Sequence, residues 1–125
     1  MKNEQKKYRL TPIIYTKDVQ GTIDFYVKKL GFLCLAQAPE FGWAKVGLND
    51  AEIMISRPNG HIPFDNSVFT GSFYIYTGNA DELWEKIKDE VKVCYPIDNF
   101  EYGLREFGIY DNNGYLLQFG HEIVN

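Results

Sequence analysis

Two carboxylates, Glu52 and Glu106, and a group of aromatic residues are the parts of this 125-residue chain best suited to chemistry. A carboxylate on an aromatic surface either meets a cation or has its pKa raised by the loss of water. Aromatic rings bind planar or cationic groups with about 0.5–2 kcal/mol per contact. The chain has nine Tyr, nine Phe and two Trp, more flat apolar surface than a small core needs. An acidic and aromatic ligand surface is therefore the first hypothesis.

The same residues also have structural explanations. Each glutamate could form a salt bridge with Arg105, Lys45 or Arg57 at a strand edge, and an acid–base pair is a third alternative. The rings best placed to stack on a ligand could instead fill the core between sheets; they are Trp43, Tyr74, Tyr76 and Tyr102.

The histidines and cysteines are expected to be structural. His61 lies in a Pro-rich loop, and His121 shares strand parity with apolar residues, which points it away from the predicted ligand surface. Cys34 and Cys94 lie in apolar stretches without a CxxC partner, so we expect small buried side chains rather than a disulfide. No phosphate-binding loop or nucleophile elbow occurs.

Charge and hydropathy exclude several partners. The formal net charge is -4 and the pI about 5.1, so no basic stripe for nucleic acid is present. Residues 1–8 lack the apolar core of a signal peptide, and no apolar run reaches the roughly 18 residues needed to span a bilayer. We expect a cytoplasmic protein with one domain and no membrane contact.

A weak internal repeat organises the chain into two β-α-β-β-β modules and predicts an α+β fold. Alternating apolar runs predict strands, helical spacing predicts a helix from Val19 to Leu30, and Asn79 with Glu82 predicts the cap of a second helix. The expected boundaries are module one at 9–57, a linker at 58–71 and module two at 72–121. The expected strands are 9–16, 32–36, 43–48, 52–57, 72–77, 91–96, 104–110 and 115–121.

Strand alternation assigns the side chains of each curved sheet to two faces. One set should pack beneath the helices: Ile14, Ile53, Ile55, Phe73, Ile75, Leu117 and Phe119. The other set should line a concave pocket: Thr11, Ile13, Tyr15, Trp43, Glu52, Met54, Ser72, Tyr74, Tyr76, Glu106, Leu116 and Gln118.

Segments 10–32 and 103–120 resemble the glyoxalase, bleomycin-resistance and extradiol-dioxygenase superfamily, also called vicinal oxygen chelate proteins. The first segment carries Asp18, Phe25-Tyr26 and Leu30-Gly31-Phe32, and the second carries Arg105-Glu106-Phe107 before Asp111-Asn112-Asn113-Gly114. The second pattern is particularly similar to bleomycin-resistance proteins. The resemblance implies paired modules and a homodimer with two pockets at the subunit interface.

The resemblance also locates four positions at which enzymatic relatives bind a divalent metal. In this chain they are occupied by Thr11, Met54, Ser72 and Gln118. Two hydroxyls, a thioether and an amide are poor replacements for imidazole and carboxylate ligands. We therefore expect no metal and no cofactor.

These observations favour a metal-free protein that sequesters a flat, cationic or amphipathic ligand, as resistance proteins do with antibiotics. The alternatives are a glyoxalase-type enzyme, similar to lactoylglutathione lyases or dioxygenases, with an atypical metal site around Glu52 and Gln118, and a dimerising module without a ligand. No catalytic residue is assigned. The expected ligand-binding residues are Trp43, Glu52, Met54, Tyr74, Tyr76, Tyr102, Glu106 and Gln118.

Overall fold

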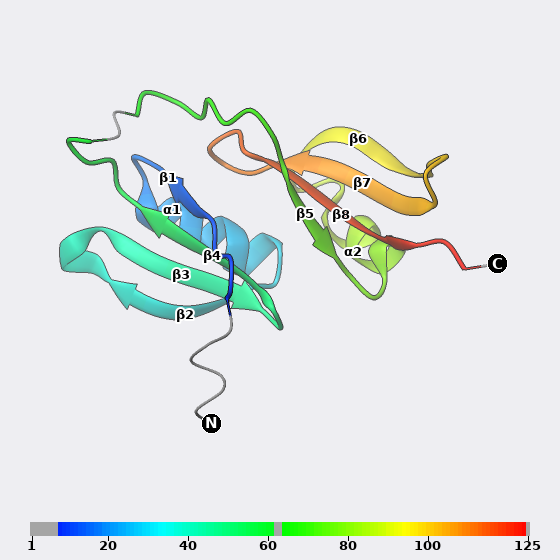
Figure 1. Cartoon of the computed structure of the whole chain (residues 1–125), viewed down its shortest axis with the longest axis horizontal. Helices are drawn as coiled ribbons and strands as arrows, with labels where there is room; N and C mark the ends of the chain where they lie inside the picture. The colour runs from blue at the N-terminus through cyan, green and yellow to red at the C-terminus, as the bar shows by residue number, and fades with distance from the viewer. Residues whose placement is uncertain (1–7, 62–63, 125) are drawn as a thin grey trace.

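The computed structural model describes residues 8–61 and 64–124, which form two open four-stranded sheets with the same topology (Figure 1). The strand order is β1-β4-β3-β2 in the first sheet and β5-β8-β7-β6 in the second. In each sheet the first strand pairs parallel with the fourth and the other pairs are antiparallel. This identity of order confirms the predicted repeat and the α+β fold.

The strand boundaries lie close to those predicted from alternation. In the first sheet they are β1 (Ile13–Tyr15), β2 (Leu33–Ala38), β3 (Trp43–Leu48) and β4 (Ala51–Ser56). In the second they are β5 (Phe73–Tyr76), β6 (Lys92–Asn99), β7 (Leu104–Tyr110) and β8 (Leu116–Glu122). β3 and β7 have the predicted limits, whereas β1 is much shorter than predicted. A short 3₁₀ turn, η3 (Pro39–Phe41), precedes β3.

One helix covers each sheet, and both begin at a side-chain cap. Asp18 accepts the Gly21 N–H at the start of α1 (Val19–Asp24), which continues as a π-helix, η2 (Phe25–Lys29). Asn79 accepts the Glu82 N–H at the start of α2 (Ala80–Ile87), as predicted. Gly31 follows the first helix with a left-handed φ of 83°, which glycine adopts without steric cost.

The predicted core face is confirmed. Ile14, Ile53, Ile55, Leu117 and Phe119 are buried, and Phe73 and Ile75 pack against them. On α2, Trp84 packs on Phe107 with ring centroids 5.1 Å apart. Within the described ranges no helix has the length and apolar character needed to cross a membrane.

The two modules contact each other through the turn between β7 and β8. The Tyr26 hydroxyl donates to the buried Asp111 carboxylate at 2.7 Å, and the Tyr115 hydroxyl donates to the Tyr15 carbonyl at 2.9 Å. Thr16 donates to Asn113 at 2.7 Å. In Figure 1 this turn lies beside β1 and α1, so the predicted closing hairpin also fixes one module against the other.

The prediction that the two cysteines are buried was wrong. Cys34 and Cys94 are free thiols and both are exposed. They lie on β2 and β6, the outer edge strands of the two sheets. An apolar stretch on an edge strand has no neighbour on one side, and the helices do not cover it here, so apolar neighbours in sequence did not indicate burial.

Candidate functional site

The open face of the second sheet centres on Glu106, whose residue exposure is only 1%. Tyr95 and Tyr102 both donate their hydroxyls to its Oε2, Tyr102 at 2.8 Å. The neighbouring residues point to the helix side: Phe107 is in the core, and Arg105 donates to Asp81 of α2 at 2.7–3.0 Å. Alternation along β7 therefore separates the glutamate from the adjacent arginine.

Gln118 extends this cluster across the sheet. Its side-chain N–H donates to the Tyr95 hydroxyl at 2.8 Å, and its Oε1 accepts a short hydrogen bond from Ser72. Tyr95 must use its own proton for the carboxylate, so it can only accept from Gln118. This requirement fixes the amide orientation and directs every donor in the series towards Glu106.

Two glycines make room for the tyrosine rings above the sheet. A Cβ at Gly108 would collide with the Tyr95 ring, and a Cβ at Gly120 would collide with the Tyr74 hydroxyl. Gly108 lies between Tyr95 and Gln118 in the register, and Gly120 lies beside Glu106. Because neither glycine carries a side chain, the phenols can lie flat against the strands around the carboxylate.

The cluster has a strongly acidic character. Of the described residues, no Lys, Arg or His forms an ion pair with Glu106. Burial raises the pKa of the Tyr95 phenol well above its usual value, and its hydrogen bond to Glu106 raises it further. Burial and the adjacent carboxylate raise the pKa of Tyr74 in the same way. Both phenols therefore stay protonated, and Tyr95 donates to a carboxylate that forms no ion pair within the described residues.

Aromatic rings surround the carboxylate. Tyr74 and Tyr76 have centroids 5.0 Å apart, and Phe100 and Tyr102 stack at 5.6 Å with an interplanar angle of 10°. Phe100 also meets Tyr95 edge to face. The Tyr76 and Tyr102 rings are the outermost, with exposures of 67% and 64%. The structure thus brings together the predicted residues of the second module.

The open face of the first sheet carries the other predicted residues in a different environment. Glu52 accepts from Arg9 at 3.0 Å and lies 3.7 Å from the Lys45 ammonium. Glu52 therefore forms a salt bridge with Lys45, one of the structural explanations given by the sequence, and Arg9 is an additional partner. Met54 is the register partner of Lys45, and Trp43 begins the same strand. Both Trp43 and Met54 are half-buried.

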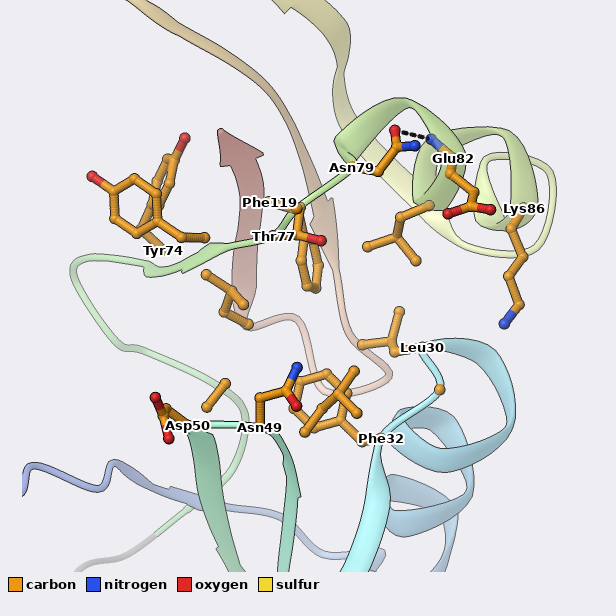
Figure 2. Close-up of a pocket in the computed structure, with 17 residues that line it drawn as sticks. Leu30, Phe32, Asn49, Asp50, Tyr74, Thr77, Asn79, Glu82, Lys86 and Phe119 are labelled. Atoms are coloured by element: carbon orange, nitrogen blue, oxygen red, sulfur yellow. Dashed lines mark hydrogen bonds between the residues drawn. The ribbon is translucent and has the colours of Figure 1, made fainter. Parts of the chain in front are cut away.

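A cavity of about 840 Å³ lies beside the Glu106 cluster and does not extend over the carboxylate. Figure 2 shows it between Asn49 and Asp50 of the β3–β4 turn and the α2 residues Glu82 and Lys86. Tyr74 and Tyr76 of β5 line it, but Glu106, Gln118, Trp43 and Met54 do not. A smaller cavity of about 380 Å³ lies between β1 and the linker. Within one chain, neither of these two cavities is lined by Glu106, and the larger of the two lies at the boundary between the modules.

The family's metal positions do not form a suitable donor set. Ser72 and Gln118 are hydrogen-bonded to each other, and the Gln118 amide nitrogen is engaged by Tyr95. Thr11 and Met54 lie on the first module and offer a hydroxyl and a thioether. In residues 8–61 and 64–124 no group of three or more His, Cys, Asp or Glu side chains could hold a metal ion. His121 lies opposite Arg105 in the register, on the helix side as predicted.

Sequence reasoning missed Tyr95, which joins Glu106 to Gln118. Val93 pairs with the core residue Ile109, and Ile97 packs against the core, so strict alternation would place Tyr95 on that same face. Register shifts on both sides of Tyr95 turn its ring to the open face instead. Gly108 was the one residue in the sequence that indicated space for an aromatic ring over β7. A glycine does not show which ring fills that space, so Tyr95 could not be identified from it.

The comparisons with known proteins agree with this geometry. The family described as Glyoxalase/Bleomycin resistance protein/Dioxygenase superfamily matches residues 9–119. The search of curated proteins gave no match.

Solved structures with the same fold cover nearly all of the chain. TioX from Micromonospora sp. ML1 has a TM-score of 0.76 and 18% identity, over 94% of this chain and 100% of that one. A lactoylglutathione lyase from Agrobacterium tumefaciens has a TM-score of 0.72 and 18% identity, over 92% and 93%. The bleomycin-binding protein of Streptomyces verticillus, complexed with copper(II)-bleomycin, has a TM-score of 0.70 and 26% identity, over 94% and 98%.

Proposed function

Because the chain belongs to the Glyoxalase/Bleomycin resistance protein/Dioxygenase superfamily, we propose that it is a small-molecule-binding protein that works without a metal ion. Its ligand is flat and cationic or amphipathic, and it lies in an acidic and aromatic groove on the open faces of the sheets. The observation that carries this proposal is the buried Glu106 carboxylate, which is ringed by tyrosines and lacks a cationic partner among the described residues. A bound cation would balance that charge.

The ligand contacts come from both modules. We assign them to the predicted residues Trp43, Met54, Tyr74, Tyr76, Tyr102, Glu106 and Gln118, and we add Tyr95. Rings supply stacking and cation–π attraction, and the carboxylate supplies a charge in a medium of low dielectric constant. Glu52 borders this groove, but Arg9 and Lys45 already offset its charge.

The relatives support sequestration more than catalysis. The bleomycin-binding protein, at 26% identity, is complexed with copper(II)-bleomycin. The lactoylglutathione lyase is less similar in sequence, and its likeness extends to the fold alone. The ligand of this chain need not be an antibiotic, since the fold does not fix the ligand.

We further propose that two copies pair in the cytoplasm, with the open sheet of one covering the open sheet of the other. In one chain these faces leave Ile13 and Tyr76 at 49% and 67% exposure. Pairing would bury them and would convert each open face into a closed groove. Light scattering should give the mass of a dimer, and Tyr76→Arg should shift it towards the monomer by placing charge in the interface.

Elemental analysis tests the metal-free proposal. The purified protein is exposed to zinc, nickel, manganese or iron salts and then desalted. We expect no stoichiometric metal, because the family's ligand positions hold a thioether, hydroxyls and an engaged amide. One retained ion per chain would instead favour the enzymatic alternative, a glyoxalase-type lyase or a dioxygenase.

Fluorescence titration tests the ligand class. Trp84→Phe removes the tryptophan of α2 that packs on Phe107. Trp43 on the open face is then the single tryptophan whose fluorescence is measured. A cationic naphthalene derivative should quench Trp43 and protect it from iodide, whereas its anionic carboxylate analogue should not bind. Equal binding of the two charges would contradict the acidic groove.

A further inference from the structure

The Glu106 cluster contains two buried polar atoms without a hydrogen-bond partner in the described part of the chain. They are Glu106 Oε1 and the Tyr74 hydroxyl. The Tyr74 hydroxyl lies close enough to the Glu106 carboxylate for hydrogen bonding to it to raise the pKa of this phenol, but no hydrogen bond of normal geometry joins the two groups. Both side chains flank Gly120. Unpaired buried polar atoms are unfavourable, and native structures keep few of them. Because these two polar atoms lie close together, we infer that a polar group of a ligand binds between them.

The rest of the network defines what that group must be. Oε2 already receives two phenol protons, and the donors of Ser72, Gln118 and Tyr95 run in series towards it. The unused atom Oε1 is a pure acceptor when the carboxylate is ionised. The Tyr74 oxygen has lone pairs that can accept as well. A ligand group with two hydrogen-bond donors would therefore satisfy both acceptor atoms, Glu106 Oε1 and the Tyr74 oxygen.

The charge of the cluster selects a cation among such groups. The carboxylate is negative, and no Arg, Lys or His of the described residues forms an ion pair with it. Tyr74, Tyr76, Phe100 and Tyr102 present aromatic rings around the same place. Aromatic rings attract any cation, including one without N–H bonds. An acceptor without a hydrogen-bond partner, in contrast, favours a cation that can donate an N–H to it.

We propose that Glu106 Oε1 and the Tyr74 hydroxyl bind a protonated amine or amidine that carries at least two N–H groups. One N–H donates to Oε1 and the other to the Tyr74 oxygen, while the rings contact the carbon frame. A quaternary ammonium satisfies the charge and the rings but neither orphan atom. This inference rests on the proposed binding function and names the group that the site recognises.

On this proposal we expect the ligand to reach Oε1 past the loop between β6 and β7. Tyr102, whose ring is 64% exposed, donates to Glu106 Oε2 and precedes Gly103, which has a left-handed φ of 92°. Rotation of Tyr102 releases one of the two donors on Oε2, while Tyr95 keeps the other in place. The carboxylate is thus uncovered without losing the hydrogen bond that positions it.

A pair of probes matched in ring and charge tests the proposal. They are 1-naphthylmethylammonium and its N,N,N-trimethyl analogue, titrated into the full chain by calorimetry. The wild-type protein should bind the first about tenfold or more tightly than the second, as expected for a charge-assisted hydrogen bond. Tyr74→Phe should lower the affinity for the primary ammonium roughly fivefold and leave the quaternary probe unchanged.

Glu106→Gln should abolish the discrimination, because its amide places a donor where the ligand needs an acceptor. Glu101→Gln is the matched control: it removes an exposed charge from the same loop and should keep the ratio of the two affinities. Equal wild-type affinities, or a ratio that survives both Tyr74→Phe and Glu106→Gln, would overturn the proposal but leave the binding function standing. No binding of either probe at millimolar concentration would overturn the cationic ligand class itself.

Discussion

Glu52 and Glu106 lie on the open faces of two sheets with the same strand order, yet their environments differ completely. Glu52 contacts two cations, Arg9 and Lys45, and its side chain is 23% exposed. Glu106 is 1% exposed, and within the described residues its side-chain hydrogen bonds come from the hydroxyls of Tyr95 and Tyr102. The repeat supplies the same scaffold twice, but of these two carboxylates only that of the second module lacks a cationic partner among the described residues.

The largest expected effect is the difference in stability between the variants that remove the Glu106 and Glu52 side chains. Glu106→Ala leaves two phenol donors unpaired and creates a cavity, so it should lower the free energy of unfolding by about 2–4 kcal/mol. Glu52→Ala removes a half-exposed ion pair and should cost at most about 1 kcal/mol. Urea denaturation of both variants measures the difference. Equal losses would mean that the two carboxylates have the same structural role.

The glycines beneath the tyrosines provide a second contrast. In Gly120→Ala the new Cβ meets the Tyr74 hydroxyl, the Glu106 Cβ and the Arg105 carbonyl, so we expect a loss of roughly 1–3 kcal/mol. Gly78→Ala, with no atom within 4 Å of the added Cβ, is the control and should change stability by less than about 0.5 kcal/mol. Thermal and urea unfolding check both. An unaffected Gly120→Ala would show that Tyr74 does not lie flat over β8.

Most of the fold could be predicted from the sequence because its periods are clear. The limits predicted for Trp43–Leu48 and Leu104–Tyr110 match the structure. Asp18 and Asn79 mark both helix starts by the chemistry of capping. The π-helix at Phe25–Lys29 has no such mark, since it changes the hydrogen-bond partner and not the residue types.

The site was predictable only as far as alternation holds. Parity placed Glu106, Gln118, Tyr74 and Tyr76 on one face, as observed. It could not place Tyr95, because two register shifts in β6 reverse the face of that residue. It also could not distinguish Glu52 from Glu106, since both have inward parity. The difference between the two glutamates depends on whether Arg and Lys side chains or Tyr side chains reach the carboxylate, and alternation along a strand does not indicate this.

The tyrosines around Glu106 should also respond to alkaline pH. Burial and the nearby carboxylate raise the pKa of Tyr95 above the usual value near 10, so unfolded chains lose this proton at lower pH than folded ones. The unfolded state then binds fewer protons, and stability falls as pH rises above 10. Tyr95→Phe should show a shallower fall, by less than about 1.4 kcal/mol per pH unit because of solvent screening.

Unfolding free energies measured between pH 8 and pH 11 test this expectation. The difference between wild type and Tyr95→Phe should be constant below pH 9, where tyrosine is protonated in both states, and should change only above it. A parallel fall of the two proteins would mean that Tyr95 ionises as easily in the folded chain as in the unfolded one. Tyr8→Phe, whose ring is fully exposed, is the control.

The smallest expected effect concerns the charge of Glu52 alone. Glu52→Gln keeps the shape of the side chain and removes its attraction to Arg9 and Lys45, which should cost about 0.2–1 kcal/mol at low salt. At 1 M salt the Debye length is about 3 Å, so screening should remove most of this loss. Glu106 should respond differently, because its contacts are hydrogen bonds in a buried environment where salt screens little. A stability difference between wild type and Glu52→Gln that persists at high salt would place Glu52 in the same class as Glu106 and remove the contrast between the modules.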